Sequence, residues 1–385
     1  MSEAQFKHFD LKLINPAFDS PLTDLIIELD HLRRKELRGT THPSVFFQLK
    51  RLFHTLESIG SARIEGNNTT IAEYIETKLE GGKSANQNII EINNIEKAMT
   101  FIEESISEYP INRFFLSQIH TLIVDALTPP PQGEGDATPG QYRKNNLKIH
   151  KSSHLPPDWI MVDNYMNELL EFIGQDDNAK YDLIKAAIAH HRFVWIHPFG
   201  NGNGRTVRLF TYAMLVKAGF NVNIGRIINP TAVFCSNRTD YYNNLAEADT
   251  GTEESQISWI MYVLEGLKQE IEKIDKLSDY TYLSKEILIP MLKVSVDRKY
   301  ITELEAKVLR RVIEEQVIQA DDIKDIFKGK SSSEISRQIK RLIDKKMLHP
   351  EQEGGRKYHL RFDNNFLMRS VITVLGEKGF LPVKD

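Results

Sequence analysis

Cysteine is nearly absent from this chain of 385 residues, which carries one thiol, Cys235. A single thiol excludes an intrachain disulfide and suits a reducing compartment, so we expect a cytoplasmic protein. The sequence also lacks an apolar run long enough to span a bilayer. Its first residues lack the basic and then apolar order of a signal peptide. We therefore expect no membrane association.

A large excess of charge is also missing, because 49 Lys and Arg stand against 53 Asp and Glu, for a net charge of −4. Any contact with nucleic acid would therefore have to come from a local basic patch.

Strand signals are few, and most apolar residues recur at helical spacing, which predicts a mainly α fold. The clearest expected helices cover residues 46–59, 71–80, 89–107, 112–127, 159–173 and 181–195.

One segment does have the pattern of a strand. In Gln141–His150 the apolar residues Tyr142, Leu147 and Ile149 are flanked by residues that favour turns. A cluster of proline and glycine over 129–135 comes before it. We predict a strand here, within a small β-hairpin.

The most informative run is 197–208, His-Pro-Phe-Gly-Asn-Gly-Asn-Gly-Arg-Thr-Val-Arg. A glycine-rich turn that leads into a helix exposes backbone N–H groups at the positive end of the helix dipole, where anions bind. Arg205 and Arg208 are three residues apart, so both guanidinium groups face the same side of that helix. His197 lies just upstream, where a general base could reach a nucleophile. The run predicts a nucleotide-binding and phosphate-transfer site.

Two common phosphate motifs do not fit this run. A P-loop needs Lys followed by Ser or Thr after its last glycine, and here Arg205 and Thr206 follow. The dinucleotide fingerprint that starts at Gly202 would need a third glycine where Val207 stands.

The run resembles the signature of the Fic family, H-x-F-x-[D/E]-G-N-G-R-x-x-R. The matching positions are His197, Phe199, Gly202, Asn203, Gly204, Arg205 and Arg208. The resemblance implies a Fic-type helical bundle with a small β-hairpin flap. It also implies transfer of AMP from ATP to a Ser, Thr or Tyr hydroxyl of a protein, the chain itself included.

The resemblance also implies roles for the matching residues. His197 would be the general base, and Phe199 would anchor the loop by packing. Gly202, Asn203 and Gly204 would form the anion nest, and Arg205 and Arg208 would neutralise the polyphosphate.

Asn201 departs from the signature, because the family usually has an acid there that ligates Mg²⁺. An amide oxygen can still ligate a hard cation, but without charge attraction. We expect a working site that binds Mg²⁺ weakly, and an inactive enzyme is the alternative.

A second match is Ser61-Ala62-Arg63-Ile64-Glu65-Gly66, which fits the family's inhibitory pattern [S/T]-x-x-x-E-[G/N]. Glu65 is implied to pair with Arg208, which would take that arginine from the γ-phosphate. In some family members such a glutamate also positions the water that removes AMP. Taken alone, the pattern also fits a helix C-terminus capped by Gly66.

The segment Gly140–Ile149 resembles the family's flap, which pairs with a target protein by strand addition. The implied docking residues are Tyr142, Arg143, Leu147 and Ile149. A purely structural hairpin is the alternative.

A different pattern begins near Ile301. Three helical stretches are followed by two short apolar segments around a Gly354-Gly355 turn, which resembles a winged helix-turn-helix. Residues 330–361 hold nine Lys or Arg against four acids. This local excess fits either a DNA-facing surface or a docking surface for protein. We expect a Fic domain with its N-terminal extension at 1–275, a linker at 276–298 and a winged-helix-like domain at 299–385.

Two functions from different classes follow. The first is an autoinhibited protein adenylyltransferase that uses ATP and Mg²⁺, with a protein as its substrate. The alternative is a DNA-binding transcriptional regulator whose Fic core senses nucleotide or is inactive. The sequence leaves open whether the chain forms a homodimer.

Overall fold

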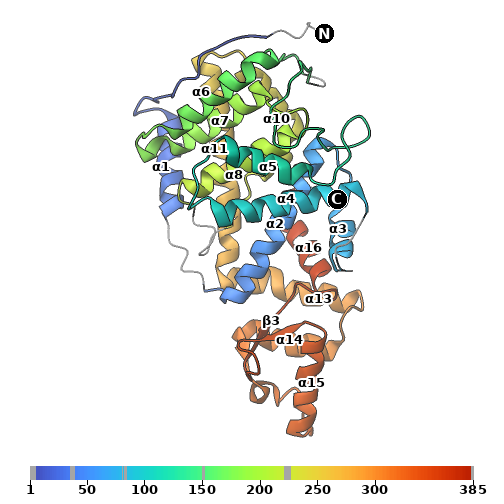
Figure 1. The fold of residues 1–385 in the computed structure, drawn as a ribbon. Coiled ribbons are helices and arrows are strands. Elements are labelled where there is room, and N and C mark those ends of the chain that lie inside the picture. The colour runs from blue at the N-terminus through green and yellow to red at the C-terminus, as the bar shows by residue number, and fades with distance from the viewer. Residues whose placement is uncertain are drawn as a thin grey trace. The chain divides into compact units, whose positions relative to one another are not determined.

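The structure is a computed structural model that describes residues 6–34, 40–79, 81, 85–149, 152–220 and 227–382. Over these residues the chain is mainly helical, as predicted (Figure 1). It divides into two compact units. The first holds the described parts of 1–36, 54–69 and 84–271, and the second holds those of 37–53, 70–83 and 272–385.

The first unit contains most of the helices. It includes the C-terminal part of α2 (Pro43–Glu65) and most of α11 (Glu253–Asp275). Its other helices are α1 (Pro21–Arg34), α4 (Gln87–Ser105), α5 (Arg113–Val124), η1 (Trp159–Met161), α6 (Val162–Gly174), η2 (Ala179–Tyr181), α7 (Asp182–Ile196), α8 (Asn203–Lys217), α9 (Thr231–Cys235) and α10 (Arg238–Ala248).

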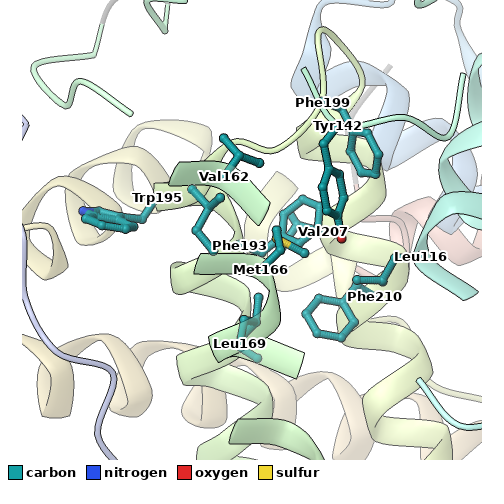
Figure 2. Packing of buried hydrophobic residues seen from close by; sticks show 12 residues of the cluster. Leu116, Tyr142, Val162, Met166, Leu169, Phe193, Trp195, Phe199, Val207 and Phe210 are labelled. Carbon is teal, nitrogen blue, oxygen red and sulfur yellow. The ribbon is translucent and has the colours of Figure 1, made fainter. Parts of the chain in front are cut away.

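The core of this unit lies between α5, α6, α7 and α8. Figure 2 shows Phe193 of α7 and Phe210 of α8 packed with Met166 of α6 and Leu116 of α5. Helix α7 is buried along almost its whole length. This burial fixes the two helix ends between which residues 197–202 lie.

The second unit combines helices with a small sheet. Its helical elements are the N-terminal part of α2, then α3 (Ile71–Leu79), η3 (Lys276–Ser278), α12 (Tyr280–Tyr282), the π-helix η4 (Leu283–Leu288), α13 (Ile289–Asp297), α14 (Glu303–Glu315), η5 (Ala320–Ile323), α15 (Ser332–Asp344) and α16 (Met368–Glu377). Strands β1 (Val317–Ile318), β2 (Leu348–Pro350) and β3 (Tyr358–Leu360) form an antiparallel sheet in the order β1-β3-β2.

The C-terminal helices begin where the sequence favours a helix start. Thr302 and Glu305 form a capping box at α14, and Ser331 and Glu334 form another at α15. The stretch predicted as a second helix is a short 3₁₀ helix, η5, followed by turns.

Two sequence-based expectations need correction. Residues 276–298, predicted as a linker, are helical in the structure, because their apolar residues recur at helical spacing and are buried, among them Leu283, Ile287 and Met291. The strand predicted over Gln141–His150 does not form within 141–149, and His150 lies outside the described residues. A strand needs a partner, and no other described segment pairs with this one.

Among the helices of the described residues, none combines the length and the apolar character that crossing a membrane requires.

Candidate active site

The run 197–208 joins two packed helices through a tight loop. His197 follows the last residue of α7 and has a left-handed backbone, with φ 52°. Gly202 precedes α8 and also has a positive φ, 73°. Glycine adopts this conformation at little cost, and two side chains of α5 lie 3.3 Å from where a Cβ at 202 would be. The predicted glycine turn into a helix is therefore present, with its backbone N–H groups at the start of α8.

His197 is held in one tautomer. Its Nδ1 lies 3.3 Å from the carbonyl oxygen of Val194. A carbonyl only accepts hydrogen bonds, so Nδ1 carries the proton and Nε2 is the basic nitrogen. Burial lowers the pKa of His197 to about 4, so the ring is neutral at physiological pH.

Side chains from two other elements close the loop. The amide of Asn203 accepts from the N–H of Phe199 and donates to its carbonyl, each at 2.9 Å. Phe199 is buried, and its ring stacks on His120 with centroids 3.8 Å apart. His120 Nδ1 accepts from the N–H of Gly140 (2.8 Å), and its Nε2 lies 3.0 Å from the carbonyl of Asn201. The packing role expected for Phe199 is confirmed, whereas the side chain of Asn203 serves the loop itself.

Arg208 is occupied by the segment that matches the inhibitory pattern. Its Nε donates to Ser61 Oγ at 2.8 Å. One terminal nitrogen donates to the Ser61 carbonyl at 2.9 Å and to Glu65 Oε1 at 2.7 Å. Burial alone would raise the pKa of Glu65, but the Arg208 guanidinium holds the pKa below its usual value. Glu65 is therefore a carboxylate that forms a partly buried ion pair with Arg208.

The same carboxylate lies over the N-terminus of α8. A Cβ placed on Gly204 would be 2.1 Å from Glu65 Oε1. Only glycine at this position permits such an approach. Glu65 thus brings its negative charge to the end of the helix that favours anions.

Arg205 is also held by a carboxylate. Its side chain is fully buried, and NH1 lies 2.9 Å from Oε1 of Glu91 on α4. Its NH2 donates to the carbonyl oxygen of Glu134 at 2.6 Å and lies 3.6 Å from that residue's carboxylate. Sequence reasoning placed Arg205 on phosphate and missed Glu91, because nothing in the spacing of α4 marks that glutamate.

Asn201 faces the loop that carries Glu134. Its backbone N–H donates to Asp136 (2.9 Å), and its Nδ2 donates to the carbonyl of Gly135 (3.1 Å) and toward Glu134 Oε2 (3.4 Å). These bonds engage the amide nitrogen, so the amide oxygen is the atom of this side chain that could ligate a cation. Within the described ranges no group of three His, Cys, Asp or Glu residues could hold a metal ion. One neutral oxygen fits a hard cation only weakly.

The segment proposed as the flap runs beside the motif loop. The N–H of Arg143 donates to the carbonyl of Pro198 (2.8 Å), and its Nε donates to the carbonyl of His197 (2.9 Å). Tyr142 is buried with its ring 5.6 Å from that of Phe199. Leu147 and Ile149 are half-buried, so of the four residues expected to dock a target, two are engaged inside the domain. A pocket of about 340 Å³ lies along this segment and reaches Gly200.

Fold and site together describe a mainly helical protein in which a neutral histidine, His197, precedes a helix N-terminus that the carboxylate of Glu65 occupies. Residues 110–215 match the model of the Fic/DOC family.

Two related proteins match a longer part of the chain, about half of its length. It is 29% identical over 201 residues to a protein adenylyltransferase Fic of Nematostella vectensis. The matched region covers 50% of this chain and 42% of that protein. It is 28% identical over 204 residues to the protein of the same name from Drosophila melanogaster, with coverage of 51% and 37%. The matched part thus spans less than half of these relatives.

Solved structures show the same fold. A Fic family protein from Desulfovibrio desulfuricans G20 has a TM-score of 0.56 at 19% identity, and the match covers 92% of this chain and 98% of that one. Fic-1 from C. elegans has a TM-score of 0.53 at 20% identity, with coverage of 66% and 71%.

Proposed function

We propose that the chain is an autoinhibited protein adenylyltransferase that moves AMP from ATP to a Ser, Thr or Tyr hydroxyl of a protein, itself included. The observation that carries this proposal is the position of Glu65, bonded to Arg208 over the start of α8. A carboxylate held there stands in for a phosphate of the nucleotide. The names of the relatives in Nematostella and Drosophila support the same reaction.

His197 would act as the general base through Nε2. It takes the proton of the target hydroxyl while the hydroxyl oxygen attacks the α-phosphorus of ATP. The bond from that phosphorus to the β-phosphate oxygen breaks, and pyrophosphate leaves. Arg208, the N–H groups around Gly202 and Gly204, and Arg205 would stabilise the charge that develops on pyrophosphate.

Mg²⁺ would neutralise phosphate charge when it is bound. Asn201 Oδ1 is the protein ligand that we assign to it, and the ATP oxygens would supply most of the remaining coordination. We expect weaker Mg²⁺ binding than an acid at 201 would give.

The target protein would lie along residues 140–149. Residues 140–149 form no helix or strand and have no partner strand among the described elements, which supports pairing of their backbone with an added strand. Lys144 and Lys148 are exposed there and would favour an acidic target segment. Removal of AMP by water that Glu65 positions, a cytoplasmic location and a homodimer stay predictions.

The DNA-binding regulator remains the second candidate because of residues 299–382. The order α14, β1, η5, α15, β2, β3 resembles that of a winged helix, which supports this candidate. Arg337, Lys340 and Arg341 are exposed on α15, where they could contact phosphates. Docking of a protein on the same surface fits these observations equally.

Self-labelling by labelled ATP tests the proposal. Glu65→Gly frees Arg208, and we expect transfer to rise by roughly 10–10³-fold over the wild type. Adding His197→Ala to that variant should lower the rate by ~10²–10⁴-fold, because the base is lost. Glu104→Gly, which changes an exposed glutamate in the last turn of α4, should label like the wild type.

Two results would contradict the proposal. Labelling that stays low in folded Glu65→Gly removes autoinhibition by this residue. Specific retention of DNA, with no labelling of any variant, supports the regulator instead.

A further inference from the structure

One short stretch of chain reaches both arginines of the site. Glu65 holds Arg208, as described above. Two residues later, Asn67 Nδ2 donates to Oε2 of Glu91 at 2.8 Å. The other oxygen of Glu91, Oε1, lies 2.9 Å from NH1 of Arg205. All of these residues belong to the first unit.

Glu65 and Asn67 are fixed in one rigid helix end. Gly66 has φ 109°, and the N–H of Asn67 donates back to the carbonyl of Ala62 (3.1 Å), which caps the last turn of α2. Asn67 is buried, and its Oδ1 accepts from the N–H of Thr69 at 2.9 Å. A movement that takes Glu65 off Arg208 therefore also takes Asn67 off Glu91.

The pair of Glu91 and Arg205 is enclosed, with side-chain exposures of 2% and 0%. Burial raises the pKa of Glu91, while the charge of Arg205 and the amide of Asn67 act in the opposite direction. Losing the amide of Asn67 would therefore weaken the carboxylate's hold on Arg205. Nε and NH1 of Arg205 have no hydrogen-bond partner of good geometry in the described part of the chain. Both nitrogens are enclosed with the rest of the side chain, so Arg205 keeps unmet donor capacity in the inhibited state.

We propose that Glu91 is a positioning residue that neutralises Arg205 in the inhibited state. Asn67 couples this restraint to that of Glu65, because both residues lie on the same helix end and are released together. The inference rests on the proposed function, because it concerns how the same nucleotide site is regulated. One helix end then governs both arginines, each through a different carboxylate. Phosphate supplies the counter-charge of Arg205 once Glu91 is released.

The first test is ATP affinity, measured by titration calorimetry on the full chain with Mg²⁺ present. Glu91→Gln keeps the shape of the side chain but removes its charge, so Arg205 loses its nearest carboxylate and can bind phosphate more strongly, with the Glu134 carboxylate still 3.6 Å away. We expect the Kd for ATP to fall on the order of tenfold. Unchanged or weaker binding by the folded variant would overturn the inference.

A second pair of variants separates this restraint from general packing. Asn67→Ala removes the bond to Glu91, together with those to the Asn88 carbonyl and the Thr69 N–H, and should tighten ATP binding about threefold. Asn94→Ala is the matched control, because Asn94 is also buried and bonds only backbone carbonyls, those of Ile123 and Asp125. It should leave the Kd unchanged. If Glu91→Gln fails to fold, Asn67→Ala against this control decides the question.

The double variant tests whether Asn67 acts through Glu91. In a Glu91→Gln background, Asn67→Ala should give no further gain, and an additive gain would contradict the route through Glu91. Labelling of the Glu65→Gly variant distinguishes failure of this inference from failure of the proposed function. If that variant labels and Glu91→Gln binds ATP no tighter, this inference alone fails. If no variant binds ATP, the proposed function fails with it.

Discussion

His197 is neutral at a pH where an ordinary histidine begins to protonate. Burial lowers its pKa to about 4, and its contact with Val194 leaves Nε2 as the basic nitrogen. The base would therefore be ready across the whole range from pH 5 to pH 8. The neutral state that the proposed base requires is therefore set by the burial of His197, before any substrate binds.

The rate of transfer should follow this low pKa. In Glu65→Gly we expect the labelling rate to stay level from pH 8 to pH 5 and to fall below that, as Nε2 takes a proton. Because the folded pKa lies below the unfolded one, His197 also lowers stability as the pH falls from about 6.5 toward 4. Circular dichroism at each pH separates the two effects. A half-loss of rate near pH 6.5 in folded protein would mean that His197 is not the base.

The residues of the site were predictable to different degrees. The run 197–208 and the segment 61–66 carry fixed spacings, so the sequence pointed to His197 and to the pairing of Glu65 with Arg208. Glu91 and Asn67 have no such signal, because each contact depends on how separate helices pack. The side chain of Asn203 was expected in the anion nest. In the structure it forms hydrogen bonds with the backbone N–H and carbonyl of Phe199 instead.

The N-terminus of α8 is the element on which the proposed chemistry depends. The first turn of a helix has backbone N–H groups without intrahelical partners. Because Gly204 has no side chain, the Glu65 carboxylate occupies the space that a Cβ at 204 would fill. The same space would be taken by a phosphate oxygen after Glu65 leaves.

A methyl group at 204 should therefore block nucleotide. In the Glu65→Gly background no carboxylate opposes the new Cβ, so the fold is retained, and the Kd for ATP should rise at least tenfold, about 1.4 kcal/mol. Gly174→Ala is the control, since a Cβ at 174 has nothing within 4 Å. Equal ATP affinity in the two variants would place the phosphates elsewhere.

Helices were more predictable than their connections. The apolar period located α2, α4, α5 and α7 to within a few residues. It failed at 276–298, where charged residues between the apolar positions suggested a linker, although the apolar ones are buried. The strand expected over 141–150 rested on apolar residues flanked by turn residues, but a strand also needs a partner, and single-segment patterns carry no information about partners.

The stability of the whole molecule should report the competition between Glu65 and nucleotide. A ligand that binds only the folded state raises stability by an amount that depends on its concentration relative to Kd. At ATP a hundredfold above Kd, Glu65→Gly should gain roughly 5 °C in Tm. The wild type should gain less at the same ATP concentration, because ATP must first displace the carboxylate.

Scanning calorimetry with and without ATP measures this difference. Glu104→Gly serves again as the control and should shift like the wild type. A wild-type shift as large as that of Glu65→Gly would show that nucleotide binds without disturbing the pair of Glu65 and Arg208.

The ring of His120 links two parts of the molecule that would meet different ligands. One nitrogen bonds Gly140, where the flap segment begins, and the other bonds Asn201 in the motif loop. A peptide that moves residues 140–149 therefore changes the energy of the loop, and nucleotide bound at the loop changes the energy of the segment. Because such coupling is reciprocal, each ligand alters the affinity of the other by the same factor. Nucleotide occupancy would in this way set how strongly the domain holds its target.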